Sequence, residues 1–189
     1  MEPEVKKIIF SSFLLIATAS CSAEEVECHY KASFVQEAAV TDSSVALSHW
    51  STERDRKSDE YIKKLYLVYK NGDIAVIEHK YCDMYNFEVS YSFSSQNPAP
   101  TSQSIGQIVA KHAQYAQLTP TYSPSLSSIV TSELEKNAFN GQKPLSLGLP
   151  QEPLTFDDFV EYSVSFLPNK ESNILQSSLS FYMGIGGAD

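Results

Sequence analysis

The chain has 189 residues, and its 14 basic and 23 acidic side chains give a formal net charge of −9. A hydrophobic content of 42% is too high for a disordered chain, and the sequence has neither the glycine period of collagen nor the dense cysteines of a small disulfide-rich scaffold. The acidic balance argues against a nucleic-acid-binding protein, because contact with phosphates requires a clustered positive surface.

The first residues of the chain have the pattern of a secretory signal peptide. Lys6 and Lys7 precede an apolar run over residues 8–17, and small residues follow it. The run has about ten to twelve residues, whereas a helix that spans a membrane needs about 20. We therefore expect residues 1–23 to direct export and residues 24–189 to form a single domain.

The end of this segment, Thr18-Ala19-Ser20-Cys21, resembles the lipoprotein box of bacteria, in which the cysteine becomes the lipidated N-terminus. Thr18 departs from the large aliphatic residue that is usual at its position. Two outcomes therefore stay open, lipidation of Cys21 or simple cleavage before Ser20 or Glu24. The resemblance implies a protein of the bacterial envelope, either periplasmic or anchored to the outer membrane, or secreted if it is cleaved and released.

With Cys21 removed or lipidated, Cys28 and Cys82 remain, and two cysteines in an exported chain predict one disulfide. The bridge would close a loop of about 54 residues, which contributes roughly 4 kcal/mol in the loop-entropy model. The rival is a zinc site made by Cys28, His29, His79 and Cys82. Adjacent residues of a strand point to opposite faces, so Cys28 and His29 cannot easily share one metal. We expect no metal and no other cofactor.

Patterns of alternating apolar and polar residues predict a series of strands in the first half of the chain. The strongest local pattern is a hairpin around Asn71-Gly72, which suits a tight turn between two β-rich runs. The strand after the hairpin alternates cleanly and completes an antiparallel meander. The predicted strands are residues 25–35, 43–50, 61–70, 73–82 and 85–94.

Apolar residues at helical spacing predict two helices, one over residues 103–117 and one that begins at Ser123-Pro124. Alternation then returns over residues 160–166 and 175–183 and predicts two last strands. Glycines near the C-terminus predict a flexible tail. The order of elements predicts an α+β fold, in which two helices pack on one antiparallel sheet that contains the meander and the two C-terminal strands.

Asp157, Asp158 and Glu161 form a carboxylate cluster that a hydrolase could use as an acid and a base. The more ordinary interpretation is charge at the start of a helical turn over residues 155–158, or a solvated edge. The sequence contains no Walker loop and none of the motifs HExxH, GxSxG and CxxC, which mark common catalytic sites.

Aromatic residues give weaker candidates for a binding site. Trp50 is the only tryptophan and lies beside His49 and a charged segment, a position at which exposed aromatics often anchor partners, although a core position is the commoner role of tryptophan. A stripe headed by Tyr85 could stack on sugars, but so apolar a stripe more often belongs to the core. The stripe consists of Tyr85, Phe87, Tyr91 and Phe93.

Together these features predict an exported envelope protein that binds another protein, as an inhibitor, an immunity protein or an accessory factor, rather than an enzyme. Its acidic surface would attract a basic partner. Two alternatives stay open, a periplasmic hydrolase that uses the carboxylate cluster or a histidine, and a carbohydrate or small-ligand module that uses exposed aromatics. We expect no nucleic-acid partner, and membrane contact only through a lipid anchor at Cys21.

Overall fold

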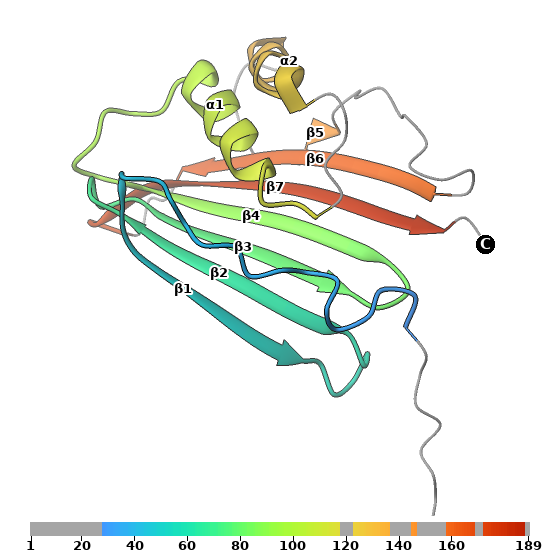
Figure 1. Ribbon diagram of the computed structural model, residues 1–189. Helices are drawn as coiled ribbons and strands as arrows, with labels where there is room; N and C mark the ends of the chain where they lie inside the picture. Colours follow the sequence, from blue (N-terminus) through green and yellow to red (C-terminus); the bar gives the residue numbers. More distant parts are fainter. Residues whose placement is uncertain (1–27, 118–122, 137–144, 147–157, 169–171, 188–189) are drawn as a thin grey trace, which may run out of the picture.

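A computed structural model describes residues 28–117, 123–136, 145–146, 158–168 and 172–187 (Figure 1). The predicted signal peptide, Cys21 and Asp157 lie outside these residues. The elements follow one another as β1 (Val45–Arg54), β2 (Tyr61–Tyr69), β3 (Ile74–Tyr81), β4 (Tyr85–Ser94), α1 (Ser102–Ala113), α2 (Ser123–Lys136), β5 (Leu145–Ser146), β6 (Asp158–Pro168) and β7 (Leu175–Gly187).

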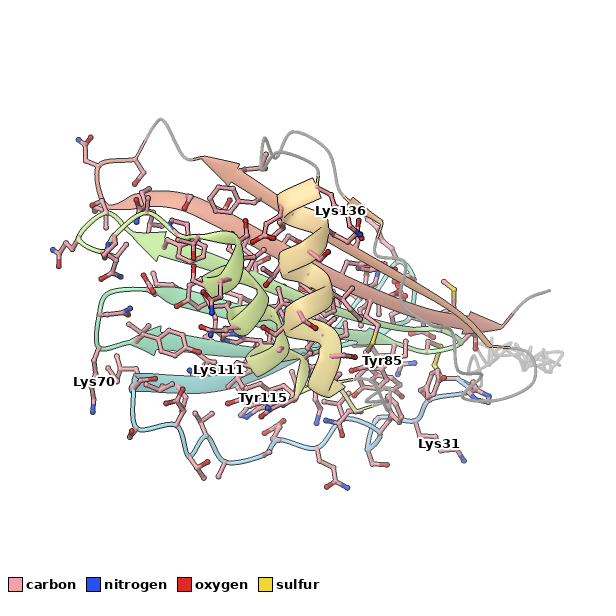
Figure 2. The ribbon with its side chains drawn as sticks, turned by 90° about the horizontal axis from the view of Figure 1, so that it is seen from above. Lys31, Lys70, Tyr85, Lys111, Tyr115 and Lys136 are labelled. Atoms are coloured by element: carbon pink, nitrogen blue, oxygen red, sulfur yellow. A yellow bond between two sulfur atoms is a disulfide. The ribbon has the colours of Figure 1, made fainter. Side chains whose placement is uncertain are left out.

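The strands form one antiparallel sheet in which the order of neighbours is β1-β2-β3-β4-β7-β6-β5. Strands β2 to β4 form the predicted meander, and β1 extends it by pairing with β2. After the two helices the chain returns through the two-residue strand β5, and β7 then pairs with both β4 and β6. Both helices lie on the same side of the sheet (Figures 1 and 2), and the predicted α+β fold is confirmed.

The turn between β2 and β3 confirms the predicted hairpin. Gly72 has a φ of 86°, in the left-handed region that glycine adopts without steric penalty. Asp73 holds the turn, because its carboxylate accepts hydrogen bonds from the Tyr91 hydroxyl and from the backbone N–H of Ser94, each at 2.7 Å. The hairpin is thereby tied to β4.

The sheet buries one face and leaves the other uncovered. Side chains at alternate positions of β2, β3, β4, β6 and β7 point towards the helices and form the hydrophobic core. We call this side the helix face and the other side the open face. The most deeply buried side chains of the helix face include Leu65, Leu67, Ile77, Tyr85, Phe87, Val89, Phe181 and Met183.

Helix α1 starts one residue before the predicted range and ends at Ala113, earlier than predicted. Thr101 caps its N-terminus: the Thr101 hydroxyl accepts from the backbone N–H of Ser104, and the Ser104 hydroxyl accepts from the backbone N–H of Thr101. Gly106 faces α2, where a Cβ atom would overlap the carbonyl oxygen of Ser127. The glycine therefore allows the two helices to pack closely.

His112, in the last turn of α1, ties this helix to the sheet. Its Nδ1 lies 2.7 Å from the carbonyl oxygen of Ile108, which can only accept, so Nδ1 carries the proton and Nε2 accepts from the Tyr69 hydroxyl at 2.7 Å. Burial lowers the pKa of His112 to about 4, so the ring is neutral at pH 7. Both ring nitrogens have partners, which is the arrangement of a structural histidine.

The strand predicted over residues 25–35 is wrong for the part that the structure describes. Residues 28–40, which we call the strap, contain no helix or strand (blue in Figure 1). Phe34 and Val35 are consecutive, yet both pack against the core, which the alternation of a strand does not allow. The strap instead lies against the helix face, where the Trp50 indole and the Lys63 ammonium donate to its carbonyl groups.

The predicted disulfide between Cys28 and Cys82 is confirmed. It joins the first residue of the strap to the residue after β3, and the backbone N–H of Tyr30 donates to the Cys82 carbonyl at 2.8 Å beside it. Because both sulfurs form the disulfide, neither cysteine is available as a thiolate ligand for the alternative zinc site. A disulfide is compatible with an exported protein.

The flexible glycine tail is a second correction. Strand β7 continues through Gly184 to Gly187, and Gly184 pairs with Asn86 of β4 on one side and with Glu161 of β6 on the other. A Cβ atom at Gly184 would lie 2.5 Å from the Tyr182 hydroxyl, so the glycine makes room for that ring. Pairing on both flanks holds Gly184 in a strand, and pairing with β6 holds Gly186 and Gly187, despite the low strand propensity of glycine.

Candidate functional site

The open face carries the exposed side chains from which we build the candidate site. Both helices and the strap lie on the helix face, and Figure 2 views the molecule from that side, with α1 and α2 crossing in front of the sheet. The register of the strands places alternate residues of β1 to β4 on the open face in rows that run across the sheet. Neighbours in one row contact each other directly.

Exposed apolar side chains occupy the corner of the open face formed by β1, β2 and β3. Leu47, Val68 and Ile74 are direct neighbours across these strands and are 69%, 36% and 38% exposed. In the next row the rings of His49 and Tyr66 stack with centroids 6.4 Å apart. We call these five residues the apolar patch. Contiguous exposed apolar residues on a soluble protein often mark an interaction surface.

Strand β1 contributes Leu47 and His49 to the apolar patch and forms one edge of the sheet. It pairs with β2 on one side, and within the described part of the chain no strand pairs with its other side. Its outward N–H and C=O groups can therefore accept an incoming strand. A register shift between Val45 and Leu47 interrupts the ladder with β2 at one end. The rest of the ten-residue strand is regular.

Charged side chains lie beside the apolar patch, towards the middle of the open face. Lys64 and Glu78 form an ion pair at 2.9 Å, and the hydrogen bond from Glu78 raises the pKa of Lys64. Glu78 also lies directly opposite Glu88 on β4. Carboxylates in opposed positions repel one another. Among the described side chains Glu88 accepts only from hydroxyls, at 2.9 Å from Ser180 and 3.5 Å from Ser90.

A shallow hollow of about 170 Å³ lies in this charged region. Within it the Tyr182 hydroxyl donates to the side-chain oxygen of Asn86 at 2.7 Å. Lys80 reaches Glu60 at 2.7 Å, and that hydrogen bond raises the pKa of Lys80. The hollow is lined by Glu78, Lys80, Asn86, Glu88 and Tyr182. It offers charged and hydrogen-bonding groups to a ligand.

His49 and Trp50, which the sequence offers as a pair, point to opposite faces of β1. His49 belongs to the exposed apolar patch, whereas Trp50 packs against the core and its indole donates to the Ala38 carbonyl at 3.2 Å. The Trp50 ring also stacks on His79 with centroids 5.9 Å apart. Trp50 therefore packs in the core and is not an exposed anchor for a partner.

Tyr85 and the other aromatic residues of its stripe lie in the core, each 5% exposed or less. The Tyr85 hydroxyl accepts the backbone N–H of Gln117 at 3.0 Å, and its ring packs against Phe34 of the strap. Rings that stack on a sugar must be exposed, so the stripe offers no such platform in this conformation. Tyr66 is an exposed ring on the open face, at a position that the sequence analysis did not single out.

The carboxylate cluster is only partly described. Asp158 begins β6 opposite Gly187 of β7, and Glu161 lies opposite Gly184, while Asp157 lies outside the described residues. The side chains of Asp158 and Glu161 are also outside the described part. Asp158 is thus the first residue of a strand and not the end of a helical turn.

The described residues contain neither a cluster of metal ligands nor a helix that could cross a membrane. No group of three or more histidine, cysteine, aspartate or glutamate side chains there is placed to hold a metal ion. Of the four histidines, His79 and His112 are buried, and His29 and His49 are exposed. Neither described helix combines the length and the apolar character that crossing a membrane requires.

Val68 and Ile74 lie within the predicted strands over residues 61–70 and 73–82, but their exposure was not predicted from the sequence. The signal was present, because β2 and β3 carry apolar residues at consecutive positions, as in Tyr66-Leu67-Val68 and Ile74-Ala75-Val76, instead of alternating. In a sheet that is covered on one side, such a run must expose every second apolar residue. Leu47 required the register of β1, which the sequence alone does not supply.

The apolar patch, the open edge of β1 and the charged hollow form one continuous region of the open face. They offer apolar area, backbone hydrogen-bonding groups and partly compensated charge. Comparisons of the chain with protein-family models, with curated proteins and with solved structures found no match.

Proposed function

We propose that this protein is an exported, non-enzymatic module that binds another protein through the open face of its sheet. The observation that carries the proposal is the apolar patch. Its residues are exposed on the same strands that bury their other side in the core. Because removal of apolar area from water contributes about 25 cal/mol per Å², a partner that covers Leu47, Val68 and Ile74 gains binding free energy there.

The shape of the region favours a protein over a small ligand. Small-ligand sites are concave and enclose most of the ligand surface. The apolar patch instead lies on an extended sheet face and continues to the open edge of β1. A protein partner can cover such a face and can also add a strand to the edge, with main-chain hydrogen bonds to β1.

The charges around the apolar patch favour a basic partner. Lys64 and Lys80 are engaged by Glu78 and Glu60, whereas Glu88 accepts only hydroxyl hydrogen bonds among the described side chains. The net charge of −9 adds a long-range attraction for cationic surfaces. Binding is therefore expected to weaken as salt rises.

The disulfide and the pattern of residues 1–23 support a place outside the cytoplasm. We propose a periplasmic protein, anchored to the outer membrane if Cys21 is lipidated and secreted if it is cleaved and released. An inhibitor, an immunity protein or an envelope accessory factor would act through one binding surface of this kind. The intact mass of the mature protein separates a lipidated Cys21 from a free N-terminus at Ser20 or Glu24.

A capture experiment tests the proposed surface. Oxidised mature protein is immobilised and exposed to an envelope and secreted-protein extract at low and high salt. The patch variant carries Leu47→Thr, Val68→Thr and Ile74→Thr, which place a polar but β-branched side chain, suited to a strand, at each position. We expect the wild type to retain a basic protein at low salt and the patch variant to lose it.

The matched control removes exposed apolar area elsewhere. Ile174 and Met84 are 74% and 51% exposed and lie outside the apolar patch, before β7 and between β3 and β4. The variant Met84→Ser/Ile174→Thr should retain the partner as the wild type does. If the patch variant retains the partner as well as the wild type does, or if the control variant loses it as the patch variant does, the open face is not the binding surface.

A further inference from the structure

His79 is a buried histidine with an incomplete set of hydrogen bonds. It is fully buried in β3, and its Nδ1 lies 3.0 Å from the Tyr85 hydroxyl. Its Nε2 is also buried and has no hydrogen-bond partner within the described part of the chain. A buried polar atom without a partner is destabilising, so water would stabilise this nitrogen if it could enter.

The strap and the residues that it holds cover His79. The Trp50 ring stacks on His79, and the Ala38 carbonyl of the strap accepts the indole N–H of Trp50. Phe34 of the strap packs edge-on against Tyr85 at 5.2 Å between ring centroids, and Val35 is almost completely buried beside it. Lifting the strap would therefore open a path for water to His79.

One cation faces His79 directly. Lys63 of β2 lies opposite His79 in the register, and its ammonium donates to the Val35 carbonyl at 2.9 Å and pairs with Glu37 at 3.3 Å. The other neighbours carry no charge at neutral pH: Trp50 from β1, Phe87 from β4, and the Tyr85 phenol, whose pKa burial raises. A proton on His79 would thus place a second cation beside the one that holds the strap.

We propose that the strap is an acid-sensitive cover: protonation of His79 lifts residues 28–40 from the helix face while the helices and the rest of the sheet stay folded. The strap is tethered at both ends, by the Cys28–Cys82 disulfide and by the start of β1. Between these ends isolated hydrogen bonds and a few apolar side chains hold it, without a strand ladder. Segments of this kind open locally below the global unfolding free energy.

The direction of the pH effect follows from the two states of His79. Burial, with a smaller contribution from Lys63, lowers the pKa of His79 to about 4 under the closed strap, against 6.5 for an exposed histidine. The population of the closed state is therefore greatest above pH 6.5 and falls as the pH decreases towards 4. The ratio of closed to open strap falls by up to about 300-fold over this range.

Opening would uncover a second binding surface, independent of the apolar patch. Trp50, Tyr61 and Tyr81 lie on the helix face of β1 to β3 and pack against the core, and the Tyr81 hydroxyl donates to the Ala32 carbonyl of the strap. In the open state these rings become available to a partner. The protein would then present the apolar patch at all pH values and an aromatic surface only in acid.

Trp50 is the only tryptophan, so its fluorescence reports directly on the strap. Emission and acrylamide quenching of the oxidised protein are measured from pH 7.5 to pH 4, with far-UV circular dichroism as the measure of global folding. We expect the quenching constant to rise and the emission to shift to the red in a one-proton transition before the dichroism changes. Constant quenching, or a rise that coincides with loss of dichroism, would overturn the proposal.

Two variants identify the proton acceptor. His79→Phe keeps a ring in the stack with Trp50 but cannot take a proton, and it should abolish the transition. His49→Gln is the matched control, since His49 is the exposed neighbour of Trp50 and could quench it directly when protonated; this variant should keep the transition. The reverse pattern contradicts the proposal.

A measurement on the wild type removes any dependence on how His79→Phe folds. Amide hydrogen exchange, corrected for the intrinsic effect of pH, is compared at pH 7 and pH 5. The amides of Tyr30 and Gln36, which donate to Cys82 and Gln117, should lose protection, while those of β3 and β4 keep it. Loss of protection in both regions, or in neither, argues against a cover that opens locally.

Discussion

The helix face and the open face belong to the same strands, yet Phe87 and Ile77 are fully buried on one side while Val68 and Ile74 are more than a third exposed on the other. The helix face packs large side chains under two helices and the strap. The open face mixes apolar and charged residues and even places Glu78 opposite Glu88. One face is thus arranged for stability, and the other keeps features that stability alone does not favour.

This difference separates two kinds of mutation. A substitution on the helix face removes packed volume or leaves a buried polar group without a partner, so it should lower the free energy of unfolding. A substitution on the open face changes groups that water already reaches, so its effect on stability should be small.

The largest effect is expected from Phe87→Ala. Phe87 contacts His79 and Phe181 in the middle of the helix face, and its removal leaves a cavity. We expect the free energy of unfolding to fall by about 3–5 kcal/mol, measured by urea denaturation. Val68→Ala, in β2 and on the open face, is the comparison and should lower the free energy of unfolding much less. If both variants lose the same free energy of unfolding, the two faces do not differ in their contribution to stability.

Next is the double variant Cys28→Ser/Cys82→Ser. The bridge spans 54 residues and fastens the strap to the sheet. Without it the unfolded chain regains conformational freedom, and stability should fall by about 4 kcal/mol or somewhat less. Reduction of the wild type should have the same effect, and the double variant should not respond to reductant. A wild type indifferent to reductant would show that the strap needs no covalent tether.

The third prediction concerns the pH dependence of His112. Burial lowers its folded pKa to about 4, so its contribution to stability is fully present above pH 6.5 and is lost as the pH falls through 4. The loss should reach about 3 kcal/mol. His112→Gln should lower stability at pH 7, because Tyr69 loses its acceptor, but flatten the slope between pH 6.5 and 4. An unchanged slope would mean that other groups control acid unfolding.

A small effect of opposite sign is expected from Glu88→Gln. The substitution relieves the repulsion with Glu78 and should raise the unfolding free energy by about 0.2–1 kcal/mol. It should also reduce the salt dependence of partner binding, because it removes a carboxylate beside the apolar patch. Glu135→Gln, at an exposed position of α2, is the matched loss of one charge. If both variants weaken binding equally, only net charge matters.

The parts of the fold that the sequence predicts well are those that local chemistry determines. Strand β4 has the predicted bounds, because its alternation is unbroken and one face is buried along its whole length. The hairpin depends on Gly72, which supplies the positive φ of the turn. The disulfide was predicted from the count of cysteines and from the export that the pattern of residues 1–23 predicts.

Tertiary contacts decided the parts that were wrong or missed. The strap alternates like a strand, but the disulfide, Lys63 and Trp50 hold it in an irregular path over the helix face. The glycines of β7 form a strand because β4 and β6 flank Gly184 and because β6 pairs with Gly186 and Gly187. The apolar patch depends on the register of three strands, which a list of apolar residues does not contain.

We propose that the open face binds a partner and contributes little to stability. The most direct test measures both quantities on the patch variant, Leu47→Thr/Val68→Thr/Ile74→Thr. Each substitution should change the free energy of unfolding by about 0.5 kcal/mol or less, while the affinity for the captured partner is lost. A variant that folds as stably as the wild type and still binds the partner with wild-type affinity would contradict the account.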